Sequence, residues 1–331
     1  MDEFDLALAD ISFLSLQEKI FLKKNLDNLS DLAVLSIADI SLLIKRPIRT
    51  ALWDGARVSL RAIRNLRLLE KCGIGGVRCD EPAFPALLRE MFDPPYLLLY
   101  RGSLAALQKP CVSVVGTRAV CEEAAEATME FARSAAQNGF CVVSGLAYGV
   151  DSFAHRGALS SGEQASTVAV LPCGIDTVMP SANKCLARHI IASGGALVSE
   201  YVPGSPPEPW RYVQRNRIVA AVSSATVVTQ APPGSGALIT ADFAIDYNRE
   251  LLFHEACFCD SAKQAYERGA RRLMAKKNGA SKMRNTPEKF LEEGAPVIKN
   301  YADFVAVRQD VPGGHSLVQG GQLSLFAAAR E

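Results

Sequence analysis

Two hydrophobic patterns divide the chain. Across residues 1–70, Leu and Ile recur at spacings of three and four, first over positions 4–44 and again over positions 52–69. Such spacings place apolar side chains on one face of a helix, so this region is predicted to be all-helical. Pro47 separates the two stretches, and Gly73 follows the second, where a glycine favours a helix end.

From residue 111 to residue 253 the pattern changes to short runs of Val, Ile, Leu and Ala separated by segments with helical spacing. Apolar runs separated by helices are typical of a parallel sheet that is covered on both faces. Strands are expected at residues 112–115, 142–144, 167–171, 196–199, 227–229 and 251–253. Helices are expected at residues 122–137, 152–160, 183–193, 218–223 and 238–247.

These patterns predict four parts. Residues 1–77 form a helical domain, whose Gly73-Ile74-Gly75 turn is similar to that of SAM- or helix-hairpin-helix-like modules. Residues 78–107 form a connector, and residues 108–307 form the α/β domain. Residues 308–331, rich in Gly, Ser and Gln, are expected to be a flexible tail.

Composition narrows the class of protein. The chain has 36 basic and 35 acidic residues, so any polyanion must be bound by a local basic patch. The nine cysteines include no CxxC pair, which favours free thiols over a zinc site, and no metal or cofactor is predicted. Their odd number and the lack of a signal peptide fit a cytoplasmic protein. The apolar runs are too short to span a bilayer, so no membrane contact is expected.

Four candidate ligand-binding segments lie next to predicted strands, at whose carboxyl ends open α/β sheets bind their ligands, and three of the four contain glycine. The segments are VSVVGTR (112–118), VVSGLAYGVD (142–151), RNRIVAAVSSATVV (215–228) and APPGSGALITA (231–241). No G-x-G-x-x-G or G-K-[ST] motif occurs in them, which argues against NAD, FAD and ATP. Because two of the loops carry arginines, the expected ligand contains several phosphates.

The first loop offers a complete set of phosphate-binding groups. Gly116 lets an anion approach the backbone, Thr117 offers a hydroxyl, and Arg118 offers a guanidinium that binds phosphate bidentately. The alternative is a turn glycine beside a surface arginine. Ser144 and Gly145 begin the second loop and are assigned to the same edge of the sheet.

The second loop leads into Asp151, which is expected to cap the next helix, and His155 lies four residues later on the same helical face. With no third ligand nearby, a cap and a helix histidine are favoured over a metal site.

Arg215, Asn216 and Arg217 are predicted at a helix start, where the arginines can contact successive phosphates or the asparagine can hold the loop. Trp210 and Tyr212 lie upstream and suit either stacking with unpaired bases or the core.

Two further segments are candidates for phosphate contact. Ser235 and Gly236 open the predicted helix 238–247, whose backbone N–H groups form another anion site. Seven basic and no acidic residues lie between positions 268 and 284, and Arg271, Arg272, Lys276 and Lys277 are assigned to phosphate contact.

Together these residues identify the chain as similar to the DprA/Smf family of DNA-processing proteins. The resemblance runs from residue 82 to about residue 253, more weakly to about residue 304. It rests on DPPYLLLYRG (93–102), GTR, VVSGLAYGVDSFAH, AVLPCGIDTVMPSAN (169–183), SEYVPG (199–204), RNRIVA and SGALITA.

The resemblance implies an α/β fold with an extended Rossmann-like parallel sheet behind the N-terminal all-helical domain. It further implies sequence-independent binding of single-stranded DNA by residues 108–307, a homodimer, loading of the RecA recombinase during natural transformation, and no catalysis.

The chain departs from the family pattern at three places. Gln230 and Gly234 stand near positions that usually hold a glutamate and a lysine, so one phosphate contact is in doubt. His254-Glu255-Ala256 replaces the usual VPG after the last core strand, and the basic stretch at 268–284 has the character of an insertion.

The alternative function is enzymatic. PPGSGALIT resembles the PGGxGT loop of nucleotide phosphoribohydrolases of the lysine-decarboxylase-like group, which need a glutamate beside that loop. Glu200 and Glu208 are the nearby candidates. Release of free adenine from AMP would support this alternative.

The tail contains Gln322, Leu323, Leu325 and Phe326 in the segment QLSLF (322–326), which resembles the motif that docks bacterial repair proteins on the sliding clamp. Packing of these apolar residues against the protein itself is the alternative.

Overall fold

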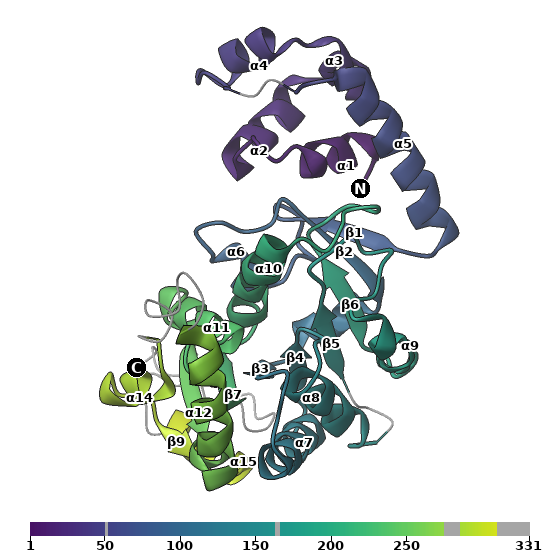
Figure 1. The fold of residues 1–331 in the computed structure, drawn as a ribbon. Coiled ribbons are helices and arrows are strands. Elements are labelled where there is room, and N and C mark those ends of the chain that lie inside the picture. The colour runs from purple at the N-terminus through teal and green to yellow at the C-terminus, as the bar shows by residue number, and fades with distance from the viewer. Residues whose placement is uncertain (50–51, 163–165, 275–284, 310–331) are drawn as a thin grey trace, which may run out of the picture.

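The computed structural model describes residues 1–49, 52–162, 166–274 and 285–309. An N-terminal helical domain lies above one end of a large sheet (Figure 1), as the pattern over residues 1–70 predicts. It contains α1 (Glu3–Asp10), α2 (Leu16–Asn25), α3 (Leu29–Val34), α4 (Ile37–Leu43) and α5 (Gly55–Lys71). Reciprocal capping pairs, such as Ser15 with Glu18 at the start of α2, stabilise these short helices.

Across the described residues, the sheet has the strand order β1-β2-β6-β5-β4-β3-β7-β8-β9. The strands are β1 (Gly75–Arg78), β2 (Leu97–Gly102), β3 (Cys111–Gly116), β4 (Cys141–Ser144), β5 (Thr167–Val170), β6 (Ala196–Ser199), β7 (Ala225–Gln230), β8 (Glu250–His254) and β9 (Val297–Ile298). All neighbours from β6 to β9 are parallel. The chain builds outward from β3 to β6 and then returns to β7 on the other side of β3. A crevice between oppositely directed connections is therefore expected at β3 and β7.

The sheet extends into the segment that the sequence analysis treated as a connector. β1 and β2 pair antiparallel, and β2 pairs antiparallel with β6. Leu97, Leu98 and Leu99 of β2 are buried, Leu98 in one apolar cluster and Leu97 and Leu99 in another. The local sequence pattern did not indicate the pairing of β2 with β6, because these two strands are about a hundred residues apart in the chain.

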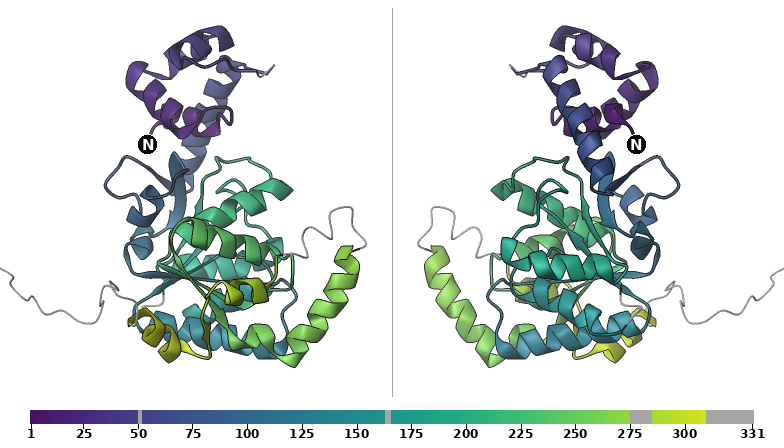
Figure 2. Two further views of the ribbon diagram at one scale, coloured as in Figure 1. Left: turned by 90° about the vertical axis from the view of Figure 1, so that its left-hand side faces the viewer. Right: turned by 90° about the vertical axis from the view of Figure 1, so that its right-hand side faces the viewer.

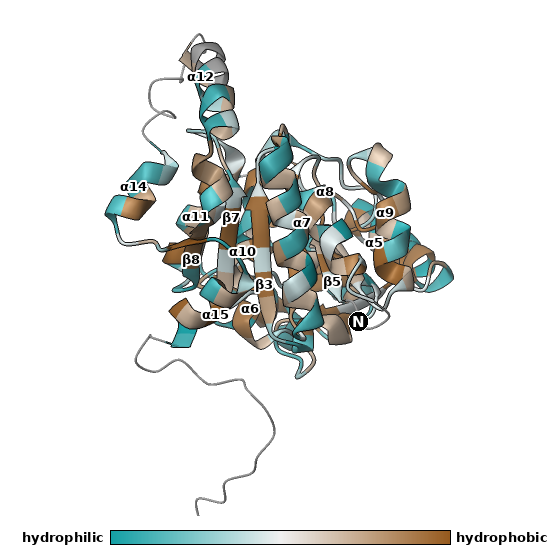
Figure 3. Cartoon of the chain, turned by 90° about the horizontal axis from the view of Figure 1, so that it is seen from below, coloured by the Kyte–Doolittle hydropathy of each residue, from teal (hydrophilic) through white to brown (hydrophobic). Residues whose placement is uncertain are grey.

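Helices cover both faces of the sheet. On one face lie α7 (Glu122–Gln137), α8 (Val150–Leu159) and α9 (Lys184–Ala192), and on the other lie α10 (Pro209–Ala221) and α11 (Gly236–Asp246). The other α-helices of the described residues are α6 (Ala86–Arg89), α12 (Asp260–Met274), α14 (Pro287–Glu292) and α15 (Tyr301–Gln309). Figure 3 shows hydrophobic strands between helices that carry hydrophilic residues on their outer sides. The predicted α/β fold with a Rossmann-like sheet is confirmed.

Alternate side chains of the central strand β3 point to opposite faces of the sheet. Val112 and Val114 of β3 pack with Phe131 of α7, whereas Val115 packs with Ile218 of α10 and Leu238 of α11. Both faces of β3 are therefore buried, which explains its unbroken apolar sequence. The helical domain joins this core through an apolar cluster that includes Leu8 and Leu97. No helix among the described residues is long and apolar enough to cross a membrane.

One predicted boundary is wrong in a way that affects the site. α10 begins at Pro209, nine residues before the predicted start, so Arg215, Asn216 and Arg217 lie within the helix instead of at its beginning. Proline suits the first helical turn because its missing N–H has no partner there.

Candidate functional site

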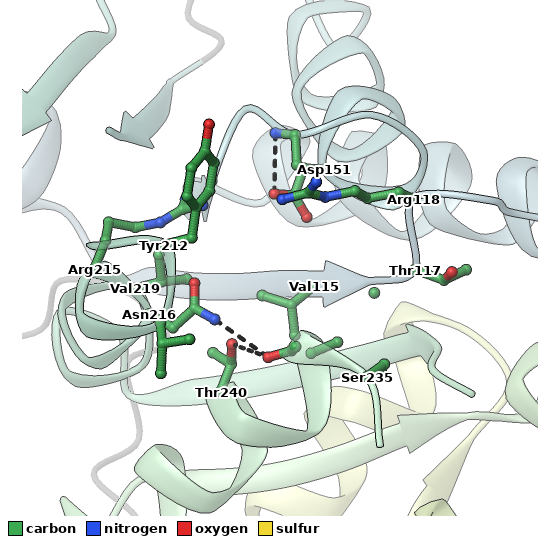
Figure 4. Close-up of a pocket in the computed structure, with 16 residues that line it drawn as sticks. Val115, Thr117, Arg118, Asp151, Tyr212, Arg215, Asn216, Val219, Ser235 and Thr240 are labelled. Carbon is green, nitrogen blue, oxygen red and sulfur yellow. Dashed lines mark hydrogen bonds between the residues drawn. The ribbon is translucent and has the colours of Figure 1, made fainter. Parts of the chain in front are cut away.

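A pocket of about 420 Å³ lies at the carboxyl ends of β3 and β4, beside the start of α11 (Figure 4). Its wall comes from the loop after β3, the loop after β4, α10 and α11. The polar and glycine residues that line it are Gly116, Thr117, Arg118, Gly145, Asp151, Tyr212, Arg215, Asn216, Ser235, Gly236 and Thr240. The structure thus brings together residues from all four candidate segments.

The loop after β3 is held tightly at its base. The Thr117 N–H donates to the Gln230 carbonyl at 2.7 Å, and the Val150 N–H donates to the Thr117 carbonyl at 3.1 Å. Gly149 has a φ of +72°, and a Cβ there would collide with the Thr117 carbonyl. Glycine at position 149 therefore lets the loops after β3 and β4 touch.

Arg118 projects from this loop into solvent at the pocket. Its guanidinium carbon lies 5.4 Å from the ring centroid of Tyr212, close enough for a cation–π contact. Arg118 is exposed, and no ion pair involves it within the described part of the chain. Its donors therefore remain available for an anionic ligand, and the Tyr212 ring lies beside them.

The first turn of α11 provides a second set of donors. Ser235 occupies the N-cap position, yet its hydroxyl caps no backbone N–H. The Ser235 Oγ is buried and has no hydrogen-bond partner among the residues described. Free N–H groups at the start of an 11-residue helix and this hydroxyl together offer hydrogen-bond donors of the kind that bind anions.

Asn216 connects α10 to α11. Its Nδ2 donates to the Gly236 carbonyl at 3.2 Å, and the Thr240 Oγ1 donates to the same oxygen at 3.4 Å. Of the two roles considered for Asn216, the structure shows the one that holds the loop.

Arg215 is buried beneath the pocket, not extended into it. Its Nη1 donates to the Val170 carbonyl at 2.8 Å, and its guanidinium lies against Gly145. Burial lowers the pKa of Arg215, and Asp151 opposes that effect. Arg215 thus contributes charge to the pocket floor while holding the end of β5.

Ser144 faces the protein interior, contrary to its assignment to the binding edge. Its Oγ is buried and donates to the Val114 carbonyl at 2.7 Å. The side chain ties β4 to β3 because the last residue of a parallel strand points into one of the two covered faces.

Asp151 and His155 are structural groups of α8. The helix is capped at Gly149, not at Asp151 as predicted, and the Asp151 carboxylate instead accepts the Ala147 N–H at 3.2 Å. Burial raises the pKa of Asp151, and Arg215 opposes that rise. The His155 Nδ1 lies 2.7 Å from the Thr167 Oγ1. Burial, assisted by Arg215, lowers the pKa of His155 to about 3, which keeps the imidazole neutral.

Arg217 faces away from the site, toward the helical domain. It pairs with Glu200, donates through Nη1 to the Asp93 carbonyl at 2.7 Å, and places Nε 3.4 Å from the Asp93 carboxylate. Burial raises the pKa of Glu200, and Arg217 opposes that rise. The expectation that Arg217 joins the binding edge is therefore corrected: it lines a different pocket.

The other candidates are distributed as follows. Trp210 is 53% exposed and makes an edge contact with Tyr201, so it is not a core residue. Arg271 and Arg272 belong to α12, which extends beyond the rest of the α/β domain in Figure 2. Lys276 and Lys277 lie outside the described residues, as do the tail positions of the QLSLF segment.

The structure also explains one departure from the family pattern and adds a residue. The buried Gln230 Oε1 accepts the Cys121 N–H at 2.9 Å, so Gln230 holds the loop instead of facing a ligand. Thr240 of α11 lines the pocket and was not predicted. It lies one helical turn after Gly236, and no local motif marks it.

These features define a class: a doubly wound Rossmann-like protein whose candidate ligand pocket lies where the strand order reverses. The sequence profile described as DNA recombination-mediator protein A matches residues 76–295, and the chain belongs to this DprA/Smf family.

Individual relatives agree with this membership. Protein Smf of Borreliella burgdorferi is 31% identical over 276 residues, which cover 82% of this chain and 86% of the relative. Protein Smf of Synechocystis sp. is 41% identical over 177 residues, which cover 52% of this chain but only 44% of the relative.

Solved structures of two relatives share the fold. DNA processing protein A from Streptococcus pneumoniae superposes with a TM-score of 0.66 at 26% identity, over 92% of this chain and 98% of that one. DNA processing protein A from Helicobacter pylori, described for its single-stranded DNA binding mode, gives a TM-score of 0.55 at 27% identity, over 71% and 94%.

Proposed function

We propose that this protein binds single-stranded DNA, without base preference, across the pocket at β3 and α11. The observation that carries the proposal is the exposed Arg118 guanidinium beside the Tyr212 ring, in one pocket with the start of α11. A guanidinium and helix N–H groups suit backbone phosphates, and an adjacent ring suits an unpaired base. The single-stranded DNA binding mode described for the Helicobacter pylori relative supports the proposal.

The available groups favour backbone contact over base recognition. Asn216, the side chain in the pocket best suited to pair with a base edge, donates to the Gly236 carbonyl. The remaining donors are a guanidinium, hydroxyls and backbone amides, which bind phosphate irrespective of sequence. Stacking on Tyr212 would also tolerate every base, because every base has a π-face.

We further propose that the pocket binds its ligand without catalysis. The carboxylate that lines it is Asp151, which is buried and accepts a backbone N–H. Of the glutamates considered for an enzymatic role, Glu200 pairs with Arg217 in a different pocket and Glu208 stands at the N-cap of α10. Neither is placed to stabilise a cation in the site at β3.

The proposed setting follows from family membership. We propose that the protein acts as a cytoplasmic homodimer that protects incoming DNA and loads RecA during natural transformation. Nine free cysteines fit a reducing compartment. Docking of the QLSLF tail on the sliding clamp is a separate proposal that rests on sequence, and a titration of clamp with residues 316–331 tests it.

The decisive experiment is a set of binding curves for single- and double-stranded oligonucleotides of equal length over a range of salt concentrations. We expect tighter binding of the single strand and a log–log slope of about −0.7 per phosphate contacted. Equal affinity for both forms, or release of adenine when AMP is added, would contradict the proposal.

A further inference from the structure

We propose that Cys121, Glu123 and Cys259 form a zinc site that joins the loop after β3 to the start of α12. One ligand atom from each residue lies within 4.8 Å of the others. Among the residues that the structure describes, this is the one group of three His, Cys, Asp or Glu side chains whose ligand atoms lie close enough together to hold a metal ion. Its two thiols are 138 residues apart in sequence, so no local motif indicates the cluster.

The separation of the two sulfurs fits a tetrahedral metal. The Cys121 Sγ and the Cys259 Sγ are 3.8 Å apart. Two zinc–sulfur bonds of about 2.3 Å at a tetrahedral angle place their sulfurs about 3.8 Å apart. A disulfide would need the same atoms about 2.05 Å apart. The present arrangement therefore accepts a metal without movement of the sulfurs.

The chemistry of the third ligand also favours zinc. Thiolates select soft or borderline ions, and Zn²⁺ accepts two sulfurs, a carboxylate oxygen and a water in a tetrahedral shell. The Glu123 side chain is exposed and can turn by the ångström or so that a zinc–oxygen bond of about 2.1 Å requires.

Neighbouring groups already orient these ligands. The Ser261 Oγ donates to the Glu123 Oε1 at 2.6 Å, and the Cys121 N–H donates to the Gln230 Oε1 at 2.9 Å. Such outer hydrogen bonds are typical of metal sites in proteins. Cys121 is also the N-cap residue of α7. Burial raises the pKa of its thiol to about 11, so a metal must displace the thiol proton when it binds.

The location gives the site a purpose within the proposed function. Cys121 lies three residues after Arg118, and Cys259 immediately precedes α12, which carries Arg271 and Arg272. A metal at this point would hold two basic elements at a constant separation. This consequence rests on the proposed DNA binding, whereas the metal site itself does not.

The test is zinc binding by the full-length, reduced, metal-free protein, measured by competition with a chromophoric chelator. We expect about one zinc ion per chain, with an affinity lowered more than about tenfold in Cys121→Ser and in Cys259→Ser. Cys185→Ser is the matched control, because Cys185 is an exposed thiol that lies 4.0 Å from the His189 Nε2 and outside the cluster.

Cobalt substitution supplies a second readout. Bound Co²⁺ should show thiolate-to-metal charge-transfer absorption that both cysteine variants lose and Cys185→Ser retains. Melting curves of the metal-free variants should match that of the metal-free wild type, which separates impaired ligation from misfolding. Equal zinc affinity in all four proteins, loss of binding in Cys185→Ser alone, or a Cys121–Cys259 disulfide in protein isolated without reductant would overturn the proposal. Oligonucleotide binding is not part of this readout, so each proposal can fail separately.

Discussion

The guanidinium of Arg215 lies directly against the Cα of Gly145, where any Cβ would overlap it. Arg215 reaches from α10 beneath the loop after β4 and donates to the Val170 carbonyl at the end of β5. This contact joins α10 to the ends of β4 and β5 under the candidate DNA site. It makes the glycine at position 145 a requirement of packing, independent of any ligand.

The first prediction concerns this contact. Gly145→Ala forces Arg215 out of its place and should destabilise the protein by about 1–3 kcal/mol, the usual effect of overpacking a core. Urea unfolding measures the change. Gly236→Ala is the control, since a Cβ there meets nothing within 4 Å and its φ is not in the left-handed region. Equal midpoints for the two variants would contradict the placement of Arg215.

The second prediction separates DNA contact from folding. Arg118→Ala should weaken binding of single-stranded DNA by about 1.5–3 kcal/mol, because it removes a charge-assisted hydrogen bond. It should also reduce the salt slope by about 0.7, while the urea midpoint stays the same. Arg188→Ala, an exposed arginine of α9 that does not line the pocket, is the control. Unchanged affinity in Arg118→Ala would remove the main support for the binding site.

The third prediction concerns the buried pair of Arg217 and Glu200. Arg217→Ala leaves the Glu200 carboxylate buried without its partner and should cost about 3–5 kcal/mol of folding stability. Replacing both residues, as in Arg217→Met with Glu200→Leu, should cost less than the single change. Calorimetry or urea unfolding tests both. A stable Arg217→Ala protein with weakened DNA affinity would show instead that Arg217 touches DNA.

The fourth prediction concerns the basic segment at 268–284. Changing Arg271, Arg272, Lys276 and Lys277 to glutamine should flatten the salt dependence of DNA binding by about 0.7 for each phosphate that the variant protein no longer binds. Substitution is preferable to deletion, because α12 also carries the buried Tyr266, whose hydroxyl donates to the Cys257 carbonyl at 2.8 Å. Lys263→Gln, on the first turns of α12, serves as the control. An unaltered salt slope would show that this basic segment does not contact DNA.

The fifth prediction concerns pH. His155 has a pKa of about 3 in the folded protein and an ordinary value of 6.5 when unfolded. Between those values the unfolded chain binds one more proton, so stability present above pH 6.5 is lost as the pH falls. Acidification from pH 7 to pH 5 should cost about 2 kcal/mol through this group alone. His155→Gln should lose correspondingly less stability over that interval, while His189→Gln, at an exposed position, should follow the wild type. Parallel curves for all three proteins would contradict the burial of a neutral His155.

Much of the architecture is encoded in local sequence. The predicted bounds of the helix at 122–137 and of the strand at 196–199 equal those of α7 and β6. The hydrophobic pattern predicted these bounds correctly, because a parallel strand that is covered on both faces is apolar throughout, whereas its flanking helices are apolar on one side. The same alternation placed the glycine-containing loops at one edge of the sheet, where the pocket lies.

Only the tertiary structure decided what individual side chains of those loops do. Arg215, Asn216 and Arg217 are consecutive, and successive residues of an α-helix point about 100° apart. Arg215 therefore meets the sheet, Asn216 meets α11, and Arg217 meets the segment beside the helical domain. Which of these three side chains faces the pocket depends on how α10 packs against elements that are distant in sequence. Likewise, Cys121 and Cys259 became neighbours because β3 and β7 are adjacent and β8 follows β7 in the sheet, a relationship that spacing along the chain does not contain.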